Sequence, residues 1–205
     1  MFVALDRLLV RLRHLPSRAA ELSALRERLD AERKAEPDPE ERAAALEVRQ
    51  IKRELASATG KVEECSRCGT NMPPPGGAFK GGYCCQAATA DLFTDDEVAL
   101  LAQGGTRLAD LTAPHTQHAG CTFRGDTGCT LETEDRPAIC VRFACGELRR
   151  ELHRLGRLDA IEQLEVKLEE AYSRFARLRL QRLDREWVDT FVKGVESEVR
   201  DRRRG

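Results

Sequence analysis

The sequence predicts a mainly α-helical fold, in which a helical hairpin and a long C-terminal helix flank a small, loop-rich, metal-stabilised cysteine domain. Apolar residues recur every three or four positions in both end segments, as they do on one face of a helix. All eight cysteines and twelve of the fifteen glycines fall within residues 59–146. Charged residues make up 34% of the chain and aromatic residues only 5%, which favours long solvated helices over a large core.

Residues 1–58 are expected to form an N-terminal helical hairpin. The first apolar stripe consists of Leu5, Leu8, Leu12, Leu15, Ala19, Leu22, Leu25 and Leu29. Pro16 interrupts this stripe and predicts a kink or a restart of the helix. After a break, Asp38 can cap a second helix that has Pro39 at its first position. Because two helices joined by a short break usually fold back on each other, an antiparallel hairpin is expected.

Residues 59–146 are predicted to form a cysteine-cluster domain with one clear helix and a short β-hairpin. Thr94 and Glu97 make a capping box at the start of the helix, which a Gly-Gly pair ends. The stretch from Cys121 to Leu131 repeats a Cys-Thr-apolar pattern on both sides of an Arg-Gly-Asp-Thr-Gly turn. This pattern predicts a β-hairpin.

Residues 147–205 predict the long C-terminal helix, with Gly156 as a stop or bend before it. Its apolar stripe consists of Ile161, Leu164, Leu168, Ala171, Tyr172, Phe175 and Leu178. Beyond Leu180 the apolar residues follow each other by four positions, so the stripe rotates around the helix and its packing partner is expected to change. The helical arms are therefore expected to pack as a bundle or coiled coil, within the chain, in a homo-oligomer or with a protein partner.

Charge and hydropathy exclude several classes of protein. The 34 basic and 35 acidic residues give a formal net charge of −1, which makes nucleic acid an unexpected partner. Asp6, Arg7 and Arg11 interrupt the apolar N-terminal run, so it is not expected to be a signal peptide. No stretch reaches the ~18 uncharged apolar residues of a membrane span. We therefore expect a cytoplasmic protein with reduced thiols, which disfavours disulfides.

The cysteines are the strongest functional signal in the sequence. Eight candidate metal ligands are present: Cys65, Cys68, Cys84, Cys85, Cys121, Cys129, Cys140 and Cys145. Cys65-x2-Cys68 followed by Gly69 has the spacing that lets two sulfurs face one metal at ~2.3 Å. Ligation by sulfur suits zinc or an iron–sulfur cluster. A structural metal would also support a domain that has few apolar residues of its own, by on the order of 10 kcal/mol.

The residues leave the number and composition of the metal sites open. Eight thiols could fill two four-ligand sites, or one site with spare thiols. The adjacent Cys84 and Cys85 would point to opposite faces of an extended chain, but they could share one centre in a turn. The spacings do not match those of ferredoxins. His115 or His118, which precede Cys121, could replace one cysteine as a ligand.

The stretch from Gly82 to Cys145 resembles the YkgJ-like cysteine-cluster family, which is described as a zinc- or iron-chelating domain. The resemblance rests on the double cysteine, the Phe-Thr-Asp-Asp-Glu helix start, and CTFRGDTGCTLETEDRPAICVRFAC. It implies metal chelation by the cysteines in this order. The chain departs from the family in the fifteen residues, rich in Pro and Gly, that separate Cys68 from Cys84.

The sequence therefore predicts a metal-binding cysteine-cluster protein that acts as a structural or interaction module. One alternative is an iron–sulfur redox protein. Another is a metal-dependent enzyme, since the family is also similar to part of the flagellin lysine methylases, in which an iron–sulfur centre is implied. An enzyme would need an open coordination position and a placed acid or base. Asp126, His115 and His118 are the nearest candidates for that role, and no catalytic residue is assigned. A further alternative treats the cysteines as buried apolar residues.

Overall fold

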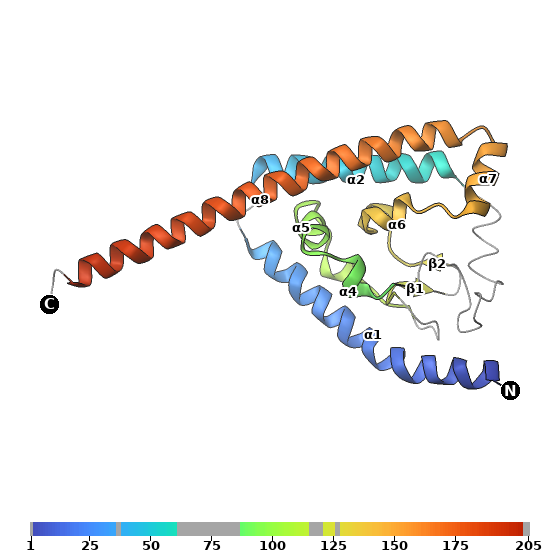
Figure 1. Ribbon diagram of the computed structural model, residues 1–205, viewed down its shortest axis with the longest axis horizontal. Coiled ribbons are helices and arrows are strands. Elements are labelled where there is room, and N and C mark those ends of the chain that lie inside the picture. The colour runs from blue at the N-terminus through green and yellow to red at the C-terminus, as the bar shows by residue number, and fades with distance from the viewer. Residues whose placement is uncertain (1, 36–37, 61–86, 115–120, 126–127, 203–205) are drawn as a thin grey trace.

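The computed structural model describes residues 2–35, 38–60, 87–114, 121–125 and 128–202. Side chains are described from Arg18 onward, apart from those of 128 and 201. Most of these residues are helical, and one long helix ends the described chain (Figure 1). The mainly α-helical fold that the periodicity predicts is therefore confirmed.

Helix α1 (Phe2–Lys34) runs through Pro16 without a break. The expected restart does not occur, and the helix instead changes direction in its N-terminal half (Figure 1). Helix α2 (Pro39–Thr59) begins as the sequence predicts. The Asp38 carboxylate accepts hydrogen bonds from the backbone N–H groups of Glu40 and Glu41 at 2.9 and 3.2 Å. The break between the two helices is thus explained by local capping.

The chain reverses direction between α1 and α2, but the two helices diverge instead of packing along each other (Figure 1). Helix α1 packs against α4 (Thr89–Leu92) and α5 (Asp95–Gln103), whereas α2 packs along α8 (Leu158–Arg202). The chain therefore folds back as the predicted hairpin requires, but α1 and α2 do not pack along each other. In the described part of the middle segment, α5 lies between the two helices and packs against both.

Two hydrophobic cores hold the chain together, and α5 contributes to both. The first core contains Ala44, Ala45, Val48, Ile51, Leu55, Ala99, Leu100, Ala138, Leu148, Leu152, Ile161, Leu168, Ala171 and Phe175. The second contains Leu25, Leu29, Phe93, Val98, Leu101, Leu111, Cys121, Phe123 and Leu131. In the second core the rings of Phe93 and Phe123 meet edge to face, with centroids 5.6 Å apart. Each core therefore joins segments that lie far apart in the sequence.

The rest of the middle segment consists of short elements. These are the 3-10 turns η2 (Leu108–Asp110) and η3 (Thr133–Asp135), strands β1 (Arg124–Gly125) and β2 (Gly128–Cys129), and helices α6 (Ala138–Arg142) and α7 (Gly146–Arg154). The two strands pair antiparallel, with Arg124 opposite Cys129. The predicted β-hairpin is thus confirmed. The Thr94 hydroxyl caps α5 by accepting from the Glu97 N–H at 3.3 Å, which also follows the sequence.

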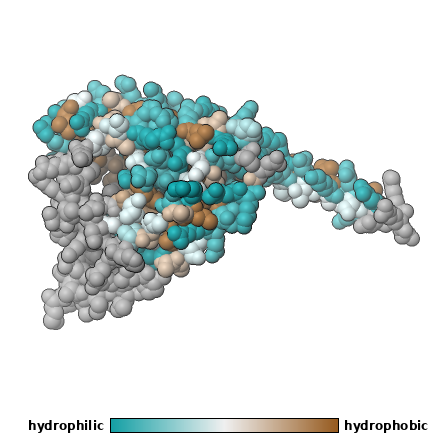
Figure 2. All heavy atoms as spheres, turned by 180° about the vertical axis from the view of Figure 1, so that it is seen from behind, coloured by the Kyte–Doolittle hydropathy of each residue, from teal (hydrophilic) through white to brown (hydrophobic). Residues whose placement is uncertain are grey.

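Helix α8 lies on α2 for its first half and then projects away from the body (Figure 1). Gly156, at φ +66°, makes the predicted turn before it. Near the point of exit, Arg182 Nε lies 2.6 Å from a carboxylate oxygen of the fully buried Glu41. Every side chain from Leu183 to Arg200 is exposed, and apolar side chains are visible along the projecting end (Figure 2). Among the described residues, no helix is apolar over a length that could cross a membrane.

Candidate metal centre

The structure describes half of the predicted ligands. Cys121, Cys129, Cys140 and Cys145 lie within the described residues. Outside them lie Cys65, Cys68, Cys84, Cys85, His115, His118 and Asp126. The geometry of the predicted centre can therefore be followed only in its second half.

Cys121 and Cys129 come together at the β-hairpin. Cys121 is buried in the second core, and Cys129 packs against the same core from strand β2. The Arg124 N–H donates to the Cys121 carbonyl at 3.1 Å, which turns the chain into β1 and so returns β2 toward Cys121. Cys129 lies near enough that its charge adds to the rise in the pKa of the Cys121 thiol. The hairpin thus brings together two candidate ligands that are eight positions apart.

The sulfur of Cys121 lies among groups that stabilise a thiolate. Burial raises the pKa of the Cys121 thiol above its ordinary value, because the charged form loses its water. The Phe123 backbone N–H, the Thr89 side chain and the Arg18 charge act in the opposite direction. Without a cation burial prevails, and the thiol keeps its proton. A bound metal ion would reverse that preference, and the same donors would then stabilise the thiolate.

Arg18 on α1 holds the Cys121 loop in place. Its Nη2 donates to the carbonyl oxygens of Cys121, Thr122 and Arg124 at 2.9, 3.0 and 3.1 Å. In return, the Thr122 hydroxyl donates to the Arg18 carbonyl at 2.9 Å, and the Thr122 N–H donates to the Thr89 hydroxyl at 2.9 Å. Sequence reasoning missed this arginine. Its partners lie more than a hundred positions away, and no local pattern marks it.

Cys145 lies at the N-terminus of α7 and packs at the edge of the first core. Its Sγ accepts a hydrogen bond from the Leu148 N–H at 3.5 Å and so caps the helix. A helix N-terminus favours a negative charge, which suits a thiolate ligand. Cys140 is half-buried on α6. In the described part of the chain, no three Cys, His, Asp or Glu side chains converge on a point that could hold a metal.

A buried ion pair positions the segment that leads to Cys140. Lys52 on α2 donates to the Arg136 carbonyl at 2.6 Å, and Glu97 on α5 accepts from the Ala138 N–H at 2.7 Å. Burial lowers the pKa of Lys52 and raises the pKa of Glu97, while each partner's charge opposes the shift of the other. The predicted capping box is therefore only half right. Thr94 caps α5, but the Glu97 carboxylate turns inward to α6.

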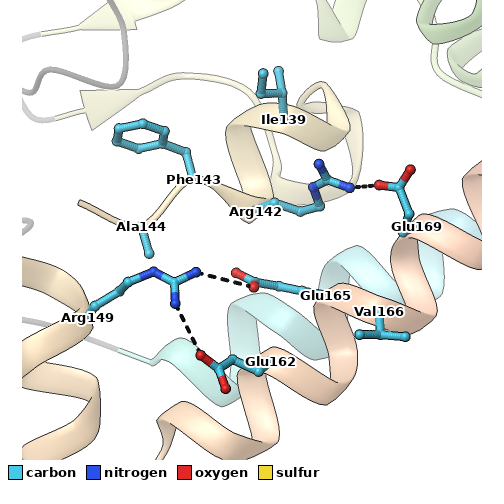
Figure 3. A pocket seen from close by; sticks show the side chains of 9 residues that line it. All are labelled: Ile139, Arg142, Phe143, Ala144, Arg149, Glu162, Glu165, Val166 and Glu169. Atoms are coloured by element: carbon cyan, nitrogen blue, oxygen red, sulfur yellow. Dashed lines mark hydrogen bonds and ion pairs between the residues drawn. The ribbon is translucent and has the colours of Figure 1, made fainter. Parts of the chain in front are cut away.

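A surface groove lies between α6, α7 and α8 (Figure 3). Two apolar side chains of the α6 segment, Ile139 and Phe143, are exposed at its rim. Arg149 on α7 pairs with Glu162 on α8 at 3.1 Å. Arg142 on α6 pairs with Glu169 on α8. These ion pairs attach α6 and α7 to α8. The groove therefore lies between the α6 segment, which carries Cys140, and the long helix α8.

Fold and cysteine arrangement together define a mainly helical protein with a cysteine-bearing β-hairpin. Comparison of the chain with protein-family models, with curated proteins and with solved structures found no match.

Proposed function

We propose that this chain is a metal-binding cysteine-cluster protein whose helical arms make it a structural or interaction module. One observation carries the proposal: the hairpin brings Cys121 and Cys129 together, with donors around the buried sulfur of Cys121. A pair of thiols at a short hairpin is half of a four-ligand sulfur site. The resemblance to the YkgJ-like family leads to the same proposal.

The remaining ligands would come from the other cysteines. Cys65 and Cys68 have the spacing of a second ligand pair, and Cys84 and Cys85 follow them in the sequence. With Cys140 and Cys145 the chain carries enough thiols for two four-ligand centres. Zinc fits a closed sulfur site of structural type, and an iron–sulfur cluster is the alternative occupant. Both fit a protein whose thiols stay reduced in the cytoplasm.

A structural role fits the distribution of packing in the chain. Among the described residues, the α2–α8 core has fourteen buried members and the core beneath the hairpin has nine. A metal at the hairpin would add free energy to the smaller of these two described clusters. In this role each ligand cysteine binds the metal, and no residue acts as a catalyst.

Metal analysis of the anaerobically purified full-length protein tests the proposal. A colourless protein containing stoichiometric zinc is the expected result. A brown protein with iron and acid-labile sulfide would show that the site holds an iron–sulfur cluster and not zinc. A folded protein that binds neither metal would overturn the proposal.

Cysteine variants test whether the hairpin supplies ligands. Cys129→Ser removes a ligand sulfur and is expected to lower the metal content per chain. Thr130→Ser changes the next residue of the hairpin but keeps the hydroxyl that donates to Phe123 O at 3.1 Å, so it is the matched control. Equal metal content in both variants would exclude Cys129 as a ligand.

A further inference from the structure

The projecting end of α8 carries an uncovered apolar face. It consists of Trp187, Val188, Phe191, Val192, Val195 and Val199, whose exposed fractions range from 45 to 68%. The rings of Trp187 and Phe191 stack on each other, with centroids 5.7 Å apart. Earlier on the same helix, a different stripe is covered by α2 and is buried at Leu168 and Phe175. At 3.6 residues per turn, Phe191 lies roughly 160° around the helix from Phe175. The helix thus continues beyond the surface that covers it.

These six side chains lie on one side of the helix. At 3.6 residues per turn they fall within an arc of roughly 140°. Asp184 and Arg202 are eighteen positions apart, which is five turns, so they occupy the same direction within this arc. The apolar face therefore has an acidic residue at its body end and a basic residue at its far end. This apolar face is termed the α8 face.

We infer that the α8 face pairs with the α8 face of a second copy of this chain in antiparallel orientation. Charge complementarity supports this occupant. Asp184 and Arg202, at the two ends of the α8 face, carry opposite charges. An antiparallel pair places Asp184 of each copy beside Arg202 of the other.

One register satisfies both the charges and the apolar residues. With the two helices centred on Lys193, Asp184 lies opposite Arg202 of the second copy. In the same register Trp187 faces Val199, and Phe191 faces Val195. A parallel pair would instead set Asp184 against Asp184 and Arg202 against Arg202, which is unfavourable.

The size of the α8 face predicts a weak dimer. Covering Trp187 and Phe191 would bury on the order of 150–250 Å² each, and the four valines add less per residue. The total per copy stays near or below the ~800 Å² per partner of a stable complex. Dimerisation should therefore depend on concentration. It involves none of the cysteines and does not rest on the proposed metal function.

Sedimentation and fluorescence of the full-length protein over a range of concentrations test the pairing. Trp187 is the only tryptophan of the chain, so its emission reports on the α8 face alone. We expect a monomer–dimer equilibrium in which the emission shifts to shorter wavelength as the dimer forms. Phe191→Glu keeps the reporter and should raise the dimer Kd ~30-fold or more. Val166→Glu, at a position 59% exposed on the body half of α8, is the matched control and should leave Kd unchanged.

A charge cycle tests the orientation. Asp184→Arg and Arg202→Glu should each weaken the dimer, and the double variant should restore it, because the reversed charges again face each other. In a parallel pair the double variant would restore nothing.

Four results would overturn the inference. A monomer with emission typical of exposed tryptophan at every concentration would exclude a second copy. A monomer with short-wavelength emission would show that the chain covers its own α8 face. A dimer insensitive to Phe191→Glu would use another surface. A dimer that the charge cycle does not affect would have another register.

Discussion

Lys52 Nζ lies 3.6 Å from Glu97 Oε2, and the two side chains are 0% and 6% exposed. This pair joins α2 to α5 inside the protein. Each partner also binds the backbone of the segment before α6, Lys52 at the Arg136 carbonyl and Glu97 at the Ala138 N–H. A single buried contact thereby ties three elements together and positions the chain that leads to Cys140.

Lys52→Met should strongly destabilise the fold. The change leaves the Glu97 carboxylate buried without its cation, which typically costs about 3–5 kcal/mol. Chemical denaturation measures the loss. Arg53→Met is the matched control, because Arg53 makes an exposed ion pair with Glu134 and its loss should cost less than ~1 kcal/mol. Similar losses in both variants would contradict the role given to the buried pair.

Arg18→Met should loosen the hairpin that carries Cys121 and Cys129. The change leaves the carbonyls of Cys121, Thr122 and Arg124 without the guanidinium that binds them, at a cost of about 1–3 kcal/mol. Hydrogen exchange should accelerate at the hairpin amides. Arg33→Met, at an exposed position of the same helix, should change stability by no more than ~0.5 kcal/mol. Unchanged exchange in Arg18→Met would refute the prediction.

Tyr172 should make stability fall at alkaline pH. Burial raises the pKa of the Tyr172 phenol above its ordinary value of 10.0, and the nearby Glu97 charge adds to the shift. The folded protein then holds a proton that the unfolded chain releases, so the contribution is complete below pH 10 and is lost as the pH rises further. Phenolate absorbance of Tyr83→Phe, which leaves one tyrosine, measures the titration. A midpoint at or below 10 in the folded protein would contradict this account.

Removing the metal should loosen the hairpin region more than the long helices. The α2–α8 core is built from apolar side chains of the helices themselves, whereas the hairpin would lose its coordination bonds. After chelation, hydrogen exchange should rise at 121–130 and stay low along the middle of α2. A uniform rise over both regions would show that the metal supports the whole fold.

Local signals predicted the elements, and long-range contacts decided how they pack. The Asp38 cap, the Gly156 turn and the hairpin were predictable because each depends on residues a few positions apart. The divergence of α1 and α2 was not predictable from local signals, because it depends on α5 packing between the two helices. The sequence pattern at Glu97 indicated a capping box. Glu97 is instead the buried partner of Lys52, which lies forty-five positions earlier in the chain. For the cysteines, metal ligation stays a prediction from the sequence, and the structure adds the closeness of Cys121 to Cys129.

X-ray absorption at the metal edge of the anaerobically purified protein tests the central claim most directly, because it measures which atoms bind the metal. The account predicts a first shell dominated by sulfur at ~2.3 Å. It also predicts that Cys121→Ser and Cys129→Ser each lower the sulfur number or the metal content. A first shell dominated by oxygen or nitrogen, at ~2.0–2.1 Å, or a folded protein without metal, would contradict it.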